Sequence, residues 1–243
     1  MTQASVGFHC PECVRGNAQQ VYRGPVVFDP IATKVLLGVT VAVSLLALGA
    51  SGSLGGLSVA VLTDWSLFGP FVARGDNFRL VTSGFLHSGL LHLGLNMAAL
   101  WLLGQQLERA MGRVRFVSLY AVSLLGGSFG ALLIEPRAAT VGASGAIYGL
   151  FGAIAVMQRS QGTSIWESGI GPLLGINLLV TFAVPQISIG GHLGGLVTGA
   201  LLTVVFVQMV RMKTNEWLAL IPAVLLAALL VLAAVSVAAN PVL

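Results

Sequence analysis

Seven apolar runs, separated by short polar connections, make up most of this 243-residue chain. A helix needs about 20 mainly apolar residues to cross the roughly 30 Å hydrocarbon core of a bilayer. Helices are therefore expected over Ile31–Ala50, Ser88–Gln106, Val114–Ile134, Ser144–Gln158, Ser168–Val184, Gly191–Val210 and Trp217–Ala239. The Gly-rich segment Ser51–Phe78 is too broken for a span and is expected as a loop with short interfacial helices. The runs predict an all-α fold, a polytopic membrane bundle.

The composition excludes the other broad classes of protein. Charged residues form 8% of the chain, whereas soluble domains contain about 25%. Hydrophobic residues form 56%, too many for a soluble globule or a disordered chain. The basic residues behind the net charge of +4 lie in ones and twos beside apolar runs. The expected partner is therefore the lipid bilayer, and no nucleic acid partner is expected.

Basic residues are shared unequally between the two sets of connections. One side receives nine of them: Arg15, Arg23, Lys34, Arg109, Arg113, Arg115, Arg159, Arg211 and Lys213. The other side receives three: Arg74, Arg79 and Arg137. The positive-inside rule then predicts a multi-pass protein of the plasma membrane with a cytoplasmic N-terminus and an outer C-terminus. No removable signal peptide is visible, so the first run is expected to stay as an anchor.

Polar side chains lie near the outer ends of the second, fourth and sixth helices, and such groups are unfavourable inside a membrane unless they function. Ser144 begins the fourth helix, where free backbone N–H groups favour a developing oxyanion. His192 begins the sixth helix, and His92 and Asn96 lie one turn apart on the second. Structural alternatives stay open: a helix cap for Ser144, a bond to a carbonyl for His192, and interhelical hydrogen bonds for the other two.

Two faces of small residues predict which helices touch. They are Gly145, Gly149 and Gly152 on the fourth helix, and His192, Gly195 and Gly199 on the sixth. Such faces let helices approach closely in lipid, and this contact would bring Ser144 to His192. A serine beside a histidine is an activated nucleophile with its general base. Every outer carboxylate falls in a connection, so a Ser–His dyad is expected rather than a triad.

Three motifs together resemble the rhomboid family of intramembrane serine proteases. They are His87-Ser88-Gly89-Leu90-Leu91-His92-Leu93-Gly94-Leu95-Asn96, then Gly142-Ala143-Ser144-Gly145 with Tyr148, and Gly191-His192-Leu193-Gly194-Gly195. The resemblance covers Asn77–Arg211. Because a seventh helix follows the six-helix core, the chain is similar to the bacterial form known as 6+1, and in particular to actinobacterial members. The resemblance implies a six-helix core over residues 31–212, a cytoplasmic tail over 1–30 and the added helix within 213–243.

The resemblance also implies roles for the residues of the site. Ser144 would be the nucleophile and His192 the general base. His92, Asn96 and the backbone N–H of Ser144 would bind the oxyanion. The residues that support the site would be Gly142, Gly145, Tyr148 and His87, with Tyr148 packed on the ring of His192.

Two further residues resemble structural positions of the family. Arg79 is similar to the arginine of the first outer loop, and Glu108 to the glutamate in the connection of the second and third helices. Phe78 stands where the family often has Trp before that arginine, which bears on the packing of the loop. Glu108 is followed directly by Arg109 instead of one residue later, which bears on a cytoplasmic salt bridge.

Cys10 and Cys13 follow His9 and are weak candidates for a metal site. Three ligands cannot close a tetrahedral structural zinc site, so no metal is expected. The expected chemistry requires no cofactor either.

The sequence thus predicts an intramembrane serine endopeptidase that cleaves single-span membrane proteins near the outer face. One alternative is a catalytically inactive relative that binds transmembrane segments, although Ser144 and His192 are both present. Another is a transporter or channel, which would predict internal repeats that the sequence does not show.

Overall fold

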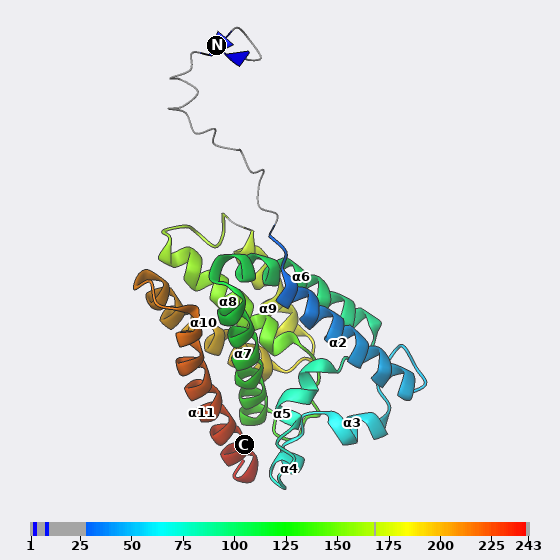
Figure 1. Ribbon diagram of the computed structural model, residues 1–243. Coiled ribbons are helices and arrows are strands. Elements are labelled where there is room, and N and C mark those ends of the chain that lie inside the picture. Colours follow the sequence, from blue (N-terminus) through cyan, green and yellow to red (C-terminus); the bar gives the residue numbers. More distant parts are fainter. Residues whose placement is uncertain (1, 4–7, 10–27, 168, 242–243) are drawn as a thin grey trace.

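Seven helices occupy the seven apolar runs. The computed structural model describes residues 2–3, 8–9, 28–167 and 169–241 (Figure 1). The long helices are α2 (Ile31–Ala50), α6 (Leu90–Met111), α7 (Arg113–Ile134), α8 (Ser144–Ser160), α9 (Ile170–Ala183), α10 (Ile189–Arg211) and α11 (Leu220–Ala239). The prediction of an all-α polytopic bundle is confirmed; the only strands described, β1 (Thr2–Gln3) and β2 (Phe8–His9), pair with each other ahead of the bundle. Cys10 and Cys13 lie outside the described residues.

Not all seven helices are long enough to cross a membrane by themselves. Four of the described helices have the length and hydropathy of a span: α2, α7, α10 and the stretch Glu216–Ala239 that contains α11. A fifth is obtained if Arg79–Phe85 and α6, which meet at a 96° bend, count together. At 17 and 14 residues, α8 and α9 fall below this length. By length and composition alone, four or five of the seven expected helices in the described part of the chain thus qualify as full spans.

The segment before α6 contains short helices, of which the first two lie in the Gly-rich segment Ser51–Phe78 where such helices were expected. They are α3 (Val59–Trp65), α4 (Gly69–Val72), α5 (Arg79–Thr82) and η1 (Ser83–Phe85), and a further turn, η2 (Glu216–Ala219), precedes α11. The predicted end of the second helix was wrong, because α6 continues to Met111. Only Gly112, with φ 84°, separates α6 from α7. Glu108 therefore lies in the last turn of α6 and not in a connection.

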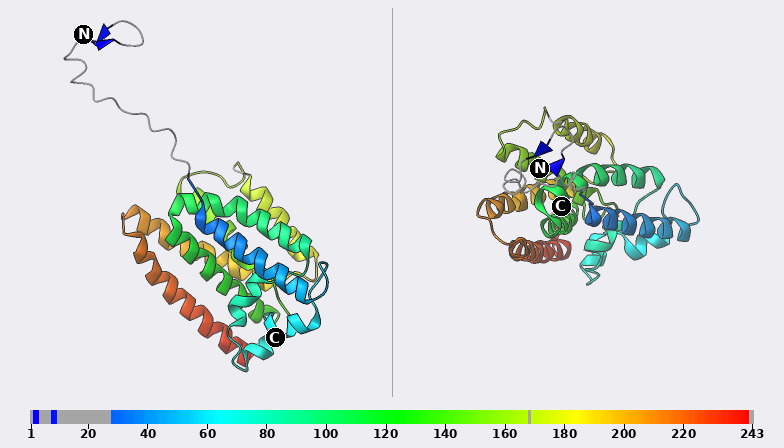
Figure 2. Two further views of the ribbon diagram at one scale, coloured as in Figure 1. Left: turned by 45° about the vertical axis from the view of Figure 1, so that its right-hand side comes forward. Right: turned by 45° about the horizontal axis from the view of Figure 1, so that its top comes forward.

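The most buried of the seven is α7, which packs against α8, α10 and α11. In Figures 1 and 2, α11 runs along the outside of α7 and α2 runs beside α6. The connections before α6, α8 and α10 meet at one end of the bundle. Leu67 pairs with Thr140 in an antiparallel bridge, and the carboxylate of Glu135 binds the start of α10. The starts of these three helices lie close together. Gly142, just before α8, lies against the ring of His92 in α6, and Gly145 of α8 lies against Gly191 of α10.

The predicted contact between the glycine faces of α8 and α10 is confirmed. A Cβ atom on Gly195 would lie 1.9 Å from the carbonyl oxygen of Gly145, and one on Gly199 would lie 2.3 Å from that of Gly149. No side chain fits into either space. The backbones of α8 and α10 therefore touch directly, as small residues allow in membrane proteins.

Arg79 holds the loop that precedes α6. Its Nε donates to Asp76 at 3.1 Å and its Nη1 donates to the carbonyl of Ser66 at 3.0 Å, with only 5% of the residue exposed. Its guanidinium also lies over the rings of Phe71 and Phe78. Phe78, the departure from the family pattern, packs edge-on against Trp65. An aromatic contact is thus retained beside the arginine.

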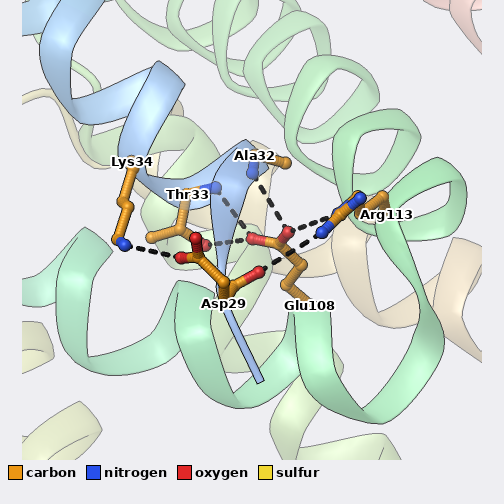
Figure 3. A network of polar contacts seen from close by, with 6 residues as sticks. All are labelled: Asp29, Ala32, Thr33, Lys34, Glu108 and Arg113. Carbon is orange, nitrogen blue, oxygen red and sulfur yellow. Dashed lines mark hydrogen bonds and ion pairs between the residues drawn. The ribbon is translucent and has the colours of Figure 1, made fainter. Parts of the chain in front are cut away.

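Glu108 joins the end of α6 to the start of α2, as Figure 3 shows. Its fully buried carboxylate accepts hydrogen bonds from the backbone N–H of Ala32 and Thr33 and from the Thr33 hydroxyl, at 2.8 to 3.0 Å. These amides belong to the first turn of α2, where backbone N–H groups have no carbonyl acceptor within the helix. The cation beside Glu108 is Arg113 at 3.4 Å, whereas Arg109 lies over the ring of Phe28.

Replacement of Glu108 by alanine should lower the free energy of unfolding by about 3 kcal/mol or more, because it leaves two amides and a hydroxyl without their acceptor. Glu108→Gln keeps one acceptor oxygen and should lose less. Thermal unfolding in detergent measures the difference, with Glu167→Ala at an exposed position as the control. Equal melting temperatures for Glu108→Ala and the control would contradict this role.

Candidate active site

Ser144 is the first residue of α8. The helix cap is Ala143, and no side chain caps the helix, so the alternative interpretation of Ser144 as an N-cap was wrong. Ser144 is partly exposed, whereas Ala143 and Gly145 on either side of it are buried. The hydroxyl therefore lies at a helix N-terminus, where backbone N–H groups are free and the positive end of the helix dipole favours an anion.

His192 lies four residues into α10 and is 8% exposed. Its ring stacks on the ring of Tyr148 with centroids 4.0 Å apart and an interplanar angle of 17°. The residues that flank the pair touch, because a Cβ on Gly145 would lie 3.3 Å from the carbonyl oxygen of Gly191. Among the described residues no hydrogen bond joins the Ser144 hydroxyl to His192. Such bonds are often long without substrate and tighten when it binds.

His92 faces the space beside Ser144. Its Nδ1 accepts a hydrogen bond from the backbone N–H of Ser88 at 3.4 Å and contacts the Ser88 hydroxyl at 3.1 Å. Because Nδ1 is an acceptor, the proton of the neutral ring is on Nε2. A Cβ on Gly142 would lie 3.0 Å from this Nε2 and 3.6 Å from the Ser144 oxygen. The absence of a side chain at Gly142 thus leaves a small space between an N–H donor and the serine.

Asn96 lies one turn further along α6 and is 8% exposed. Its side-chain nitrogen donates to the carbonyl of His92 at 2.9 Å, which leaves its second N–H available. Its side-chain oxygen is buried without a hydrogen-bond partner. The amide is consequently held on the same helix face as His92, with donor capacity that the fold does not use.

His87 ties the loop before Ser144 to α2. Ser44 donates its only hydroxyl proton to the carbonyl of Phe85 at 2.8 Å, so the contact of 2.9 Å between Ser44 and Nδ1 of His87 requires Nδ1–H as the donor. Nε2 then accepts from the backbone N–H of Ala143 at 3.4 Å. The fully buried His87 therefore positions the residue directly before Ser144.

Two residues near His192 were not identified from the sequence. Glu135 accepts hydrogen bonds from Ser188, Ile189 and Gly190, and so fixes the start of α10. The Ser-Ile-Gly-Gly pattern at this helix start was a signal for a cap, but nothing local pointed to Glu135. Thr181 of α9 contacts Nδ1 of His192 at 2.7 Å, and no sequence signal indicated it.

Metal chemistry has no visible site in the described part of the chain. No three residues among its His, Cys, Asp and Glu are grouped in a way that could hold an ion. The residues gathered at Ser144 offer instead a hydroxyl, a histidine and several N–H donors. Such a set can carry out acyl transfer, in which a nucleophile attacks a carbonyl and donors stabilise the resulting oxyanion.

Comparisons with known proteins agree on one family. A family model described as the Rhomboid domain matches residues 74–209. Rhomboid protease GluP of Bacillus subtilis (strain 168) is 37% identical over 131 residues, which are 53% of this chain and 26% of GluP. Putative rhomboid protease YdcA of the same organism is 38% identical over 141 residues, 56% of this chain and 71% of YdcA. RHOMBOID-like protein 5 of Arabidopsis thaliana is 33% identical over 135 residues, 53% of this chain and 43% of that protein.

Proposed function

The chain belongs to the rhomboid family, and from this membership we propose that it is an intramembrane serine endopeptidase with Ser144 as nucleophile and His192 as general base. The observation that carries the proposal is the direct backbone contact of α8 with α10. The contact supports a position of Ser144 near His192, because Gly145 and Gly191, the residues next to them in the chain, lie against each other. Next to Ser144 lies the Nε2–H group of His92, across the small space that the missing side chain of Gly142 leaves.

The proposed reaction is acyl transfer in two steps. The Ser144 oxygen attacks the scissile carbonyl carbon while Nε2 of His192 takes the hydroxyl proton. His192 then gives this proton to the leaving amine, and the C–N bond breaks to leave an acyl-enzyme. A water molecule then attacks the ester carbonyl while Nε2 of His192 takes one of its protons. His192 gives this proton to the Ser144 oxygen as the ester C–O bond breaks, which releases the carboxylic acid and restores the enzyme. The partial exposure of Ser144 agrees with access of water to the ester.

The oxyanion would be bound in the space beside Gly142. Donors available there are Nε2–H of His92 and the backbone N–H of Ser144, and Asn96 lies one turn further along the same face. Donors that are fixed before the reaction stabilise the developing charge without reorganisation. The absence of a side chain at Gly142 leaves room for the oxyanion beside these donors.

Gly142→Ala should therefore lower the cleavage rate by at least about 100-fold, as the loss of an oxyanion donor does in serine hydrolases. The new Cβ would lie 2.9 Å from the ring of His92, and φ at Gly142 is 130°. A control for the backbone strain is Gly162→Ala, because Gly162 also has positive φ, 75°, but open space around it. The rate is measured on a reporter in proteoliposomes. Equal losses in the two variants would contradict the assignment.

The proposed substrates are single-span membrane proteins, and the proposed site of cleavage is near the outer end of the span. The chain is a multi-pass membrane protein, and the nine-to-three distribution of basic residues supports a cytoplasmic N-terminus. In this orientation the starts of α6, α8 and α10 face outward. A substrate helix has to unwind there to expose its backbone, so we expect helix-breaking residues near the cut.

The test of this function uses the purified protein in detergent and a serine-reactive fluorophosphonate. We expect one covalent adduct per chain, found by mass spectrometry on the peptide that contains Ser144, and cleavage of a single-span reporter in proteoliposomes. Labelling of Ser236 or another exposed serine instead would contradict the assignment. A folded protein that binds the reporter but neither reacts nor cleaves would support the alternative of a catalytically inactive relative.

A further inference from the structure

Thr181 is the polar residue that the otherwise exposed helix α9 buries against the site. The buried residues of α9 are Ile170, Gly171 and Thr181, and Thr181 is 1% exposed. Its hydroxyl oxygen makes three contacts: with the carbonyl of Asn177 at 2.8 Å, with the Tyr148 hydroxyl at 2.6 Å and with Nδ1 of His192 at 2.7 Å.

Counting protons assigns the direction of each of these hydrogen bonds. A carbonyl oxygen can only accept, so Thr181 donates its single proton to Asn177. Its two lone pairs then accept from the other two partners. Tyr148 must donate its hydroxyl proton, and His192 must donate from Nδ1–H. No other arrangement satisfies all three contacts.

We propose that Thr181 is a positioning residue of the active site, whose oxygen holds His192 in the Nδ1–H tautomer so that the Nε2 lone pair faces Ser144. The inference rests on the proposed function. A carboxylate occupies the corresponding place in a serine protease triad, where it fixes the tautomer and orientation of the histidine. Here a neutral oxygen does so, and the stacked ring of Tyr148 fixes the plane of the imidazole.

A purely structural role explains less of the geometry. Buried threonines in helices commonly donate to the carbonyl four residues earlier, which accounts for the bond to Asn177. Thr203 of α10 does this alone, with a bond of 2.7 Å to Gly199 and no contact with a histidine. The two accepted bonds at Thr181 go beyond that pattern, and both come from the stacked Tyr148–His192 pair.

The test compares Thr181→Val, which keeps the shape but removes the oxygen, with Thr181→Ser, which keeps the oxygen, and with Thr203→Val as a matched control. A general base contributes a rate factor of about 100 to 10,000. Thr181→Val should lose part of this factor, so we expect kcat and the rate of fluorophosphonate labelling to fall by about 10- to 100-fold. KM should stay within about twofold, because the substrate-binding contacts are retained. Thr181→Ser and Thr203→Val should stay close to the parent.

A second readout reports the tautomer without any turnover. The chain has four histidines, so ¹⁵N spectra of protein labelled in its histidine rings can be assigned with His192→Ala. We expect His192 to be protonated at Nδ1 in the parent and in Thr181→Ser, and to be a mixture of tautomers in Thr181→Val. A parent His192 protonated at Nε2, or a Thr181→Val variant that reacts as fast as the parent, would overturn the inference. A parent that shows the expected tautomer but never reacts with the probe would contradict the proposed protease function alone.

Discussion

Ser144→Ala is expected to lower kcat/KM for a membrane-embedded reporter by at least about 10⁴-fold, because in the proposed mechanism no other group replaces Ser144 as the nucleophile. His192→Ala should have a loss of similar size. Residues that act as a unit are strongly non-additive in such experiments. The double variant should therefore be no slower than either single variant, and cleavage assays in proteoliposomes at matched protein density measure all three.

The controls for this prediction separate catalysis from folding. Ser236→Ala changes an exposed serine on α11 and should retain the parent rate. Ser144→Ala should keep the melting temperature of the parent, since the Ser144 side chain does not cap α8. If Ser144→Ala retains more than a small fraction of the parent rate while it is folded, another residue is the nucleophile.

Gly195→Ala is expected to lower the free energy of unfolding by about 3 kcal/mol or more, at the upper end of what overpacking causes. The new Cβ would lie 1.9 Å from the carbonyl oxygen of Gly145 and 2.7 Å from its carbon. Both are backbone atoms, so the clash is relieved only if α8 and α10 move apart. This movement would separate Ser144 from His192, and cleavage should be lost together with stability. Thermal unfolding in detergent and the reporter assay measure the two effects.

Gly38→Ala is the matched control, because Gly38 lies within α2 and a Cβ there meets no atom within 4 Å. Alanine is the better helix former by about 0.5–1 kcal/mol. Gly38→Ala should therefore be as stable as the parent or more stable. A Gly195→Ala variant that unfolds at the parent temperature would show that the two helices tolerate a larger separation than the structure indicates.

The sequence was sufficient to locate the helices and the contact that builds the site. Apolar length decides which segments become helices in a membrane, and this is a local property of the chain. The bounds expected for α2 were those observed. The spacing of glycines on one helix face is equally local, and it is sufficient to indicate that α8 packs on α10.

Two local expectations failed for identifiable reasons. The charged residues near the end of α6 suggested a connection, yet the helix continues through Glu108 and Arg109 because the buried carboxylate binds the start of α2. Likewise, a serine near a helix start suggested a cap as one interpretation, yet Ser144 is the first helical residue and Ala143 takes the cap position. In the first case a contact outside the local sequence decides the outcome.

The sequence by itself determined which segments of this protein are helical, and which polar residues lie near the same ends of the bundle. Only the tertiary structure decided how those polar groups are paired: Thr181 with His192, Glu135 with the start of α10, and Glu108 with that of α2. The physical reason is that a hydrogen bond between helices depends on their relative rotation and depth to within a fraction of an ångström. Hydropathy and residue spacing specify a helix and its buried face, but they leave that rotation and depth to the packing of the whole bundle.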